Sequence, residues 1–137
     1  MNSEFVYINE VGPRDGLQNQ KIILSSRIRL DLINHLIDAK LPGIEVASFV
    51  SPKAVPAMEG ANEIIQGLVD TKGCEISVLV PNMKGFEMAS EAGAEIISVV
   101  PSATETMNQK NINMGLEETI KSSCNIIKSA KSSNLRT

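Results

Sequence analysis

Four short runs rich in Val and Ile alternate with helical patterns along this chain, and that alternation limits the possible folds more than any other feature. The runs lie near residues 5–11, 43–50, 75–80 and 95–100, and each is almost continuously apolar, as buried parallel strands tend to be. Helical spacing of apolar residues follows near 25–39, 62–69, 84–92 and 116–131. Repeated strand–helix alternation predicts βα units and a parallel α/β sheet.

The connections between these segments are unequal. Helix-to-strand connections are short and marked by glycine, whereas three of the four strand-to-helix connections are long, as expected where function collects at the carboxyl ends of parallel strands. A TIM (β/α)8 barrel takes about 250 residues. Four βα units in 137 residues therefore predict the first half of such a barrel, with residues 1–137 as its N-terminal half and no second domain.

Composition excludes several classes of protein. A net charge of −3, three Phe, one Tyr and no Trp argue against a nucleic-acid binder. No apolar run is long enough to span a membrane, and the N-terminus has neither a secretory nor a transit pattern, so we expect a cytoplasmic protein. Cys74 and Cys124 are far apart and without metal-like spacing, which predicts two reduced thiols.

The stretch "EVGPRDGLQN", residues 10–19, places an Arg-Asp pair where the first strand ends. The carboxylate of Asp15 is a suitable hard ligand for Mg²⁺ or Mn²⁺. The guanidinium of Arg14 can neutralise an enolate or carboxylate oxygen. The alternative is an ordinary surface turn shaped by its glycines and proline, with both charges in water.

Glu45 lies inside the otherwise apolar second strand. Buried charges persist only when they are paired, and Arg14 on the neighbouring strand is the predicted partner. The alternative is a glutamate that reaches solvent at a strand edge. Ser48 ends the same strand, where a serine alone is usually a loop hydroxyl.

The turn resembles the first-strand motif of the 3-hydroxy-3-methylglutaryl-CoA lyase family, which belongs to a superfamily of metal-dependent barrel lyases and aldolases. The resemblance continues through "IEVASFVSPKAVPAM", "VPNMKGFEMA" and "KNINMGLEE", nearly the whole chain in order. It implies cleavage of 3-hydroxy-3-methylglutaryl-CoA to acetyl-CoA and acetoacetate by a divalent-metal-assisted retro-Claisen reaction. An acyl-CoA substrate and Mg²⁺ or Mn²⁺ are therefore the expected partner and cofactor.

The resemblance also implies roles for single residues. Asp15 would bind the metal, and Arg14, paired with Glu45, would stabilise the developing enolate as part of the catalytic group. The residues expected to contact substrate are Arg14, Gln18, Ser48, Lys110, Asn111 and Asn113. The two asparagines have an alternative role in loop hydrogen bonding or helix capping.

Three lysines, Lys53, Lys84 and Lys110, lie in or just after successive strand-exit loops and would rim one face of a barrel. Such a rim suits the phosphates of CoA, although each lysine alone is typical of a solvated surface.

The chain departs from the family pattern in several places. A His-x-His pair, an asparagine and a cysteine that the family carries in the second half of its barrel are absent from this chain. His35 is expected to be structural, on the outside of the first helix, and neither cysteine matches the catalytic one. Ala54 stands where the family usually has Trp, and Gly115 where it usually has Ser.

Two other functions remain open at this point. One is a related aldolase or acyl-CoA synthase of the same superfamily, and the other is a non-catalytic half-barrel that assembles with itself or with another chain. Under the leading interpretation the chain alone is expected to be inactive. Its expected partner is the missing second half of the barrel or a second copy in a homo-oligomer, because the outer strands would leave open edges.

Overall fold

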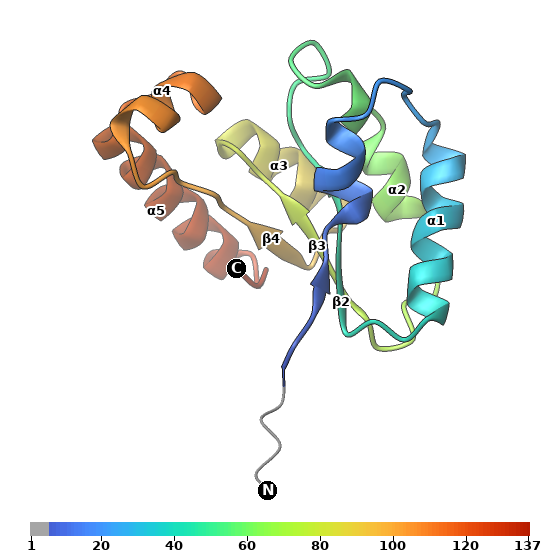
Figure 1. Cartoon of the computed structure of the whole chain (residues 1–137). Coiled ribbons are helices and arrows are strands. Elements are labelled where there is room, and N and C mark those ends of the chain that lie inside the picture. Colours follow the sequence, from blue (N-terminus) through green and yellow to red (C-terminus); the bar gives the residue numbers. More distant parts are fainter. Residues whose placement is uncertain (1–5) are drawn as a thin grey trace, which may run out of the picture.

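The computed structural model describes residues 6–137 and forms one four-stranded sheet (Figure 1). Its strands are β1 (Asn9–Glu10), β2 (Gly43–Ser48), β3 (Glu75–Leu79) and β4 (Ile96–Ser98), all parallel and in the order β1-β2-β3-β4. The predicted parallel sheet is confirmed, but each strand is shorter than its apolar run. β1 keeps only two paired residues, and residue 5 of the predicted run lies outside the described residues.

The four predicted helices are present as α1 (Ser26–Asp38), α2 (Ala61–Gly67), α3 (Met83–Ala92) and α5 (Leu116–Ser132). A further helix, α4 (Glu105–Ile112), occupies a stretch that the sequence predicts as loop, so that prediction is wrong. The stretch has little apolar periodicity, but Thr104 caps it by accepting a hydrogen bond from the N–H of Met107 at 3.3 Å. Local capping therefore forms a helix that apolar patterning does not reveal.

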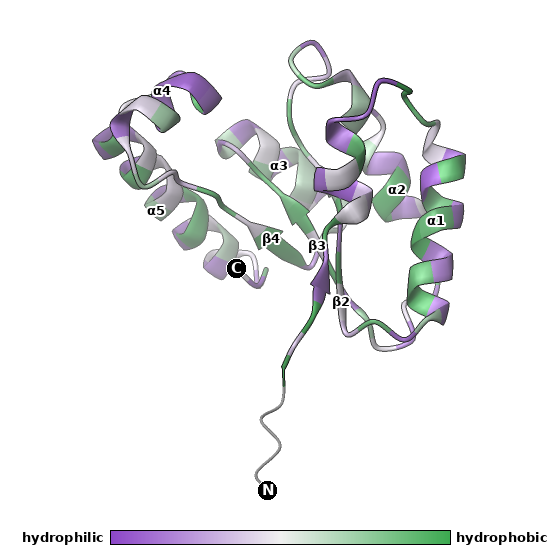
Figure 2. Ribbon diagram, in the orientation of Figure 1, coloured by the Kyte–Doolittle hydropathy of each residue, from purple (hydrophilic) through white to green (hydrophobic). Residues whose placement is uncertain are grey.

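The core lies between the sheet and the helices that cover it (Figure 2). Ile33 and Ile37 on α1, Ile64 on α2, Phe86 on α3 and Ile126 on α5 are almost fully buried against Ile44, Val46, Val78, Val80 and Ile97 of the strands and their exits. Ser25 begins α1 by accepting a hydrogen bond from the N–H of Ile28. This packing fixes the carboxyl ends of the strands on one edge of the sheet.

A β-bulge in β2 sets which side chains face away from the helices. Glu45 pairs with Ser77 of β3 and Ser48 pairs with Leu79, while the register shifts by one residue between Glu45 and Ala47. Side chains alternate along a regular strand, so residues three apart normally face opposite sides. Because Ser77 and Leu79 share one face of β3, the extra residue in β2 brings Glu45 and Ser48 to that same face.

Gly85 on α3 packs closely against the residues that follow β2 and β3. A Cβ at this position would lie 2.6 Å from the carbonyl oxygen of Phe49 and 3.0 Å from Cδ of Pro81. We expect Gly85→Ala to destabilise the chain by about 1–3 kcal/mol, since the displaced atom is backbone and overpacking exceeds the gain in helix propensity. Urea unfolding measures this, with exposed Glu87→Ala on the same helix as the control. Equal stabilities for the two variants would contradict the clash.

At the amino ends of the strands, three polar side chains connect the residues before β1, the start of β3 and the C-terminal residues. The hydroxyl of Tyr7 lies 2.7 Å from Oε2 of Glu75 and 2.9 Å from the carbonyl oxygen of Pro42, and Nη1 of Arg136 lies 2.6 Å from Oε1 of Glu75. The ion pair with Arg136 and the hydrogen bond from Tyr7 lower the pKa of Glu75. The hydrogen bond to Glu75 raises the pKa of Tyr7 to about 12.

Tyr7 gives this cluster a direct optical test, because the chain has one tyrosine and no tryptophan. We expect phenolate absorbance to titrate near pH 12 in the folded chain and closer to the ordinary value of about 10 in Glu75→Gln. A raised pKa contributes stability below the unfolded value, and that contribution is lost as pH rises from about 10 towards 12. A midpoint near 10 in the unaltered chain would contradict the hydrogen bond.

The last described residues begin to extend the sheet beyond β4. The N–H of Arg136 donates to the carbonyl of Glu95 and its carbonyl accepts from the N–H of Ile97, both at 2.9 Å, in a parallel bridge between Ile96 and Arg136. Among residues 6–137, no helix has the length and apolar character needed to cross a membrane.

Candidate active site

A single π-helical turn, Gly12–Gly16, positions the charged pair where β1 ends. The carbonyl of Val11 accepts hydrogen bonds from the N–H groups of Arg14, Asp15 and Gly16, at 3.1, 2.7 and 3.3 Å. Pro13 is buried at the start of this turn, where its missing N–H leaves no unpaired donor. The backbone around the pair is thus tied to one carbonyl at the carboxyl end of the strand. π-turns of this kind are frequent at functional sites.

Arg14 bridges two carboxylates. Its Nε donates to Oε1 of Glu45, and its Nη1 donates to Oδ1 of Asp15 at 2.7 Å. Glu45 is 4% exposed, whereas the side chain of Asp15 is 56% exposed. The ion pair predicted between Glu45 and Arg14 is therefore present, and it accounts for a charge buried within an apolar strand.

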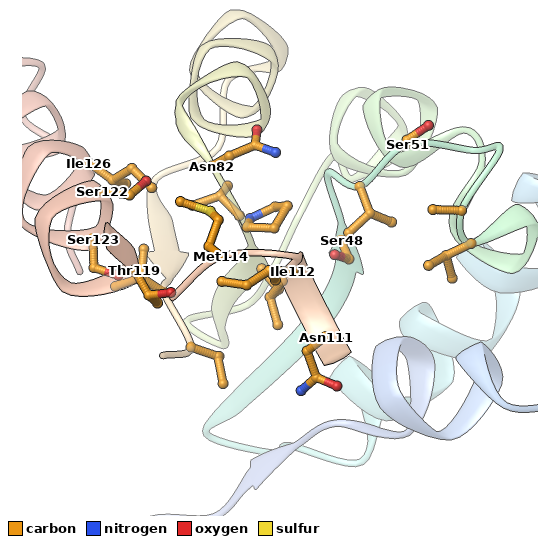
Figure 3. Close-up of a pocket in the computed structure, with 18 of the residues that line it drawn as sticks. Ser48, Ser51, Asn82, Asn111, Ile112, Met114, Thr119, Ser122, Ser123 and Ile126 are labelled. Atoms are coloured by element: carbon orange, nitrogen blue, oxygen red, sulfur yellow. The ribbon is translucent and has the colours of Figure 1, made fainter. Parts of the chain in front are cut away.

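An open pocket of about 480 Å³ lies beside this pair (Figure 3). Arg14, Asp15 and Gln18 line one side, the carboxyl-end loops of β2 and β3 line the middle, and α4 and α5 line the far side. The close-up shows Ser48 and Asn111 on one side of Met114, and Ser122, Ser123 and Thr119 of α5 on the other. The pocket thus combines charged groups at one end with hydroxyls at the other.

Ser48 is 1% exposed, and its hydroxyl has no hydrogen-bond partner among the described residues. A buried hydroxyl without a partner is costly unless a ligand or water satisfies it, so its place in the pocket wall fits a substrate contact. Asn111 also lines the pocket, but Asn113 does not. Asn113 instead ends α4 in the left-handed conformation, with φ of 53°, and its contact with a substrate stays a prediction, as does that of Asn111.

The three predicted rim lysines are exposed, and none lines the pocket itself. Lys53 lies in the loop after β2, Lys84 in the first turn of α3 and Lys110 in the last turn of α4. All three therefore lie near the edge of the sheet that carries the site. Their contact with a ligand stays a prediction.

Other singled-out residues lie away from the site. His35 is exposed on α1, with Nδ1 2.7 Å from the carbonyl oxygen of Asp31. Cys74 is buried just before β3, at the opposite edge of the sheet, and burial raises the pKa of its thiol. Cys124 is exposed on α5. Both cysteines are free thiols.

Sequence reasoning missed part of the pocket wall. Asn82 lines the pocket and begins α3 by accepting a hydrogen bond from the N–H of Gly85 at 2.9 Å. An asparagine directly after an apolar strand run is a signal that could have located it. Thr119, Ser122 and Ser123 were assigned only to a helix, and only the packing of α5 against the strand exits brings them into the pocket.

A buried arginine anchors the loop that forms the β2 side of the pocket. Arg29 on α1 is 1% exposed, and its Nη1 donates to the carbonyl of Glu59 at 2.9 Å. Burial lowers the pKa of this guanidinium. The loop it holds carries Ser51 and Ala54 at the pocket rim.

A parallel βα sheet with an arginine–carboxylate group at the carboxyl end of its first strand, together with the solved structures it superimposes on, places the chain in the class of (β/α)-barrel proteins, as a first half. The chain belongs to the HMGL-like family, whose model matches residues 5–137.

Named proteins agree with this assignment. The chain is 45% identical over 130 residues to the mitochondrial hydroxymethylglutaryl-CoA lyase of Macaca fascicularis, covering 95% of this chain and 40% of that protein. The HMG-CoA lyase of Brucella melitensis superimposes with a TM-score of 0.92 at 41% identity, over 97% of this chain and 47% of that one.

A third similar structure, an Acinetobacter baumannii HMG-CoA lyase described as a complex with coenzyme A and 3-methylmalate, has a TM-score of 0.87 at 32% identity, over 95% of this chain and 43% of that one. The chain therefore spans less than half the length of the relatives it matches.

Proposed function

We propose that this chain supplies the first half of the active site of a carbon–carbon lyase that cleaves 3-hydroxy-3-methylglutaryl-CoA to acetyl-CoA and acetoacetate. The observation that carries the proposal is the Arg14 guanidinium, held by buried Glu45 and by Asp15 at the mouth of an open pocket. The similarity to named HMG-CoA lyases over nearly the whole chain supports the same activity.

Cleavage proceeds by removal of the proton from the tertiary hydroxyl, rupture of the adjacent C–C bond and protonation of the acetyl-CoA enolate that leaves. Arg14 is suited to stabilise that enolate. Two of its nitrogens bind carboxylates, and Nη2 has no hydrogen-bond partner among the described residues. A fixed cation next to developing negative charge needs no reorganisation during the reaction.

Glu45 acts in this proposal by orienting Arg14, not by accepting a proton. Its Oε1 already accepts from Nε of Arg14, and its burial keeps the carboxylate away from bulk water. A bound guanidinium with few rotamers available holds its remaining N–H groups in fixed directions. The bulge in β2 keeps Ser48, which lines the pocket, on the same face of the strand as Glu45.

Asp15 fits one ligand of a divalent cation. Its side chain is more than half exposed at the carboxyl end of β1, and only Oδ1 is engaged by Arg14. Carboxylate oxygens suit Mg²⁺ or Mn²⁺, but the described residues contain no cluster of three His, Cys, Asp or Glu side chains that could hold an ion alone. When bound, such an ion supplies Lewis-acid polarisation of the substrate oxygens. The other ligands would come from outside the described residues.

The CoA part of the substrate is proposed to extend from the pocket along the rim that carries Lys53, Lys84 and Lys110. The similar structure with bound coenzyme A supports an acyl-CoA ligand. Gln18, Ser48 and Asn111 would contact the acyl part, since they line the pocket beside Arg14. A cytoplasmic location stays part of the proposal, and the Macaca relative is mitochondrial by name.

Joining residues 1–137 to the C-terminal half of the Brucella melitensis lyase tests the proposal. We expect the fusion to release acetoacetate from 3-hydroxy-3-methylglutaryl-CoA with Mg²⁺ or Mn²⁺, at a rate within the usual range of about 1–10³ s⁻¹. A folded fusion that leaves this substrate intact but cleaves or forms another acyl-CoA bond would favour a related aldolase or synthase. A folded fusion without any turnover would favour a non-catalytic half-barrel.

The 137-residue chain by itself gives a separate prediction. We expect no acetoacetate release above background, because one carboxylate cannot hold a catalytic ion with a near-octahedral shell. The assay is the same, at the same metal concentrations, with the fusion as positive control. Turnover by the chain alone within tenfold of about 10 s⁻¹ would contradict the assignment of an incomplete site.

A further inference from the structure

Three side chains at the amino ends of the strands meet on the face of the sheet that points away from the helices. Glu75 lies two residues before Ser77 on β3, so the two side chains point to the same side. Arg136 faces that side as well, because Ser77 pairs with Ile96 and Ile96 pairs with Arg136 in parallel register. Tyr7, before β1, places its hydroxyl 2.7 Å from Oε2 of Glu75. The cluster therefore lies on the inner face of the half-barrel.

The contacts in this cluster skip a strand on each side of Glu75. Tyr7 reaches β3 across the start of β2, where a Cβ on Gly43 would lie 2.5 Å from the tyrosine hydroxyl and 3.1 Å from its Cε1. The glycine thus leaves the space through which the ring passes. Arg136, in the segment that pairs with β4, reaches across β4 and places Nη1 2.6 Å from Oε1 of Glu75. Contacts between every second strand are typical of the side-chain layers that fill a (β/α)8 barrel.

The cluster supplies part of such a layer. One layer takes about four side chains from alternate strands. Tyr7, Glu75 and Arg136 are the members from the first, third and fifth strands, so the remaining place belongs to the seventh. The chain spans less than half the length of its relatives, so that strand belongs to the other half of the barrel. In this chain the side chains of Arg136 and Glu75 are 63% and 40% exposed, and Tyr7 is 47% exposed. The second half would cover all three.

The atoms that face the remaining place define what it accepts. Glu75 and Arg136 cancel in charge, so a further charge would be enclosed without a partner of its own. Nε and Nη2 of Arg136 have no hydrogen-bond partner among residues 6–137 and need an acceptor. The hydroxyl of Tyr7 has one hydrogen for Glu75 or Pro42 and keeps a lone pair, which needs a donor. A carboxamide supplies both, because its oxygen accepts and its N–H groups donate.

We propose that Tyr7, Glu75 and Arg136 form a polar layer that closes the barrel interior at the amino ends of the strands, and that its remaining member is an asparagine or glutamine side chain from the seventh strand. The proposal rests on the assignment of the chain as the first half of a barrel. It does not depend on the reaction, because the candidate pocket lies at the carboxyl ends of the strands. The layer gives the open inner face a specific partner, since a slipped register would turn that side chain away from the interior.

The accessibility of Tyr7 tests where the layer lies. Hydroxyl-radical footprinting with peptide mass analysis is applied to the 137-residue chain and to its folded fusion with the Brucella melitensis half. We expect oxidation of Tyr7 to be at least about tenfold slower in the fusion, because the barrel encloses the layer. Met88, exposed on the outer helix α3, should react equally in both and is the control.

Equal oxidation of Tyr7 in the chain and in the folded fusion would overturn the proposal, even if the fusion cleaves its substrate. Protection of Tyr7 in a fusion without turnover would support the layer and contradict the lyase proposal alone. The footprint and the acetoacetate assay therefore separate the two proposals.

Substitutions at the remaining place test its chemistry. The inward residue at the amino end of the seventh strand is made glutamine, leucine or glutamate, and urea unfolding of each fusion is measured. We expect the equilibrium constant for unfolding to be about tenfold smaller with glutamine than with leucine, because two hydrogen bonds are gained. Tyr7→Phe together with Arg136→Met should remove this preference. Lys72→Gln, which breaks the exposed ion pair with Asp38, should leave it unchanged.

Three results of this series would overturn the proposal. They are a glutamine form no more stable than the leucine form, a glutamate form more stable than the glutamine form, and a preference for glutamine that survives Tyr7→Phe with Arg136→Met. Because each comparison is made between fusions that differ only at the layer, a general loss of stability in one background does not change the outcome.

Discussion

Replacing Arg14 with methionine in a completed barrel is expected to lower kcat about a thousandfold, with KM and the affinity for divalent metal nearly unchanged. Methionine keeps the length of the side chain but removes the cation that faces the developing enolate, and loss of one such donor commonly reduces kcat by about 10²–10³. The interaction is made in the transition state, so substrate binding should be spared. Arg27→Met on the exposed side of α1 is the matched control. A rise in KM alone would show that Arg14 binds substrate without stabilising the enolate.

The same substitution has a structural consequence that must be separated from catalysis. Without Arg14, the carboxylate of Glu45 is left buried and unpaired, and breaking a buried pair in this way destabilises a protein by about 3–5 kcal/mol. Adding Glu45→Gln removes that charge, so the double variant should regain most of the stability while kcat stays low. Kinetics of both variants, measured well below their unfolding temperatures, distinguish the two effects. Recovery of kcat in the double variant would assign the defect to folding.

Asp15→Asn is expected to give a different signature, in which metal affinity and activity fall together. The amide keeps the shape of the side chain but removes the negative charge, and we expect at least about a hundredfold weaker binding of Mn²⁺ in calorimetry and a comparable loss of activity at fixed metal concentration. Excess metal should restore part of the rate, which it should not do for Arg14→Met. Asp31→Asn, exposed on α1, is the control. Unchanged Mn²⁺ affinity would exclude Asp15 as a ligand.

Residue patterns predict the sheet, four of the helices and the Arg14–Glu45 pair, because each follows from local signals. Apolar runs identify buried parallel strands, and a carboxylate inside such a run requires a cation close by, which Arg14 supplies from the turn after β1. The Arg-Asp turn and its place at the end of β1 follow from the same pattern, although the π-helical hydrogen bonding to Val11 does not.

Other features depend on information that the pattern lacks. The bulge between Glu45 and Ala47 arises from pairing with β3, and nothing in the composition of β2 marks the extra residue. α4 is stabilised at its start by the cap at Thr104 and has too few apolar residues for periodicity to reveal it. Sequence therefore finds the charged end of the pocket but not the hydroxyls of α5 that close its far side.

The spatial order of the strands has a consequence for how the chain is made. Each strand pairs with the one synthesised just before it, and the bridge at Arg136 adds the next residues to β4. A ribosome releasing this chain therefore delivers every new βα unit to an edge that already exists, so structure can accumulate unit by unit during translation. Among the described residues, no strand pairs with the outer side of β1. The backbone groups of that edge therefore stay unpaired for the longest time during synthesis.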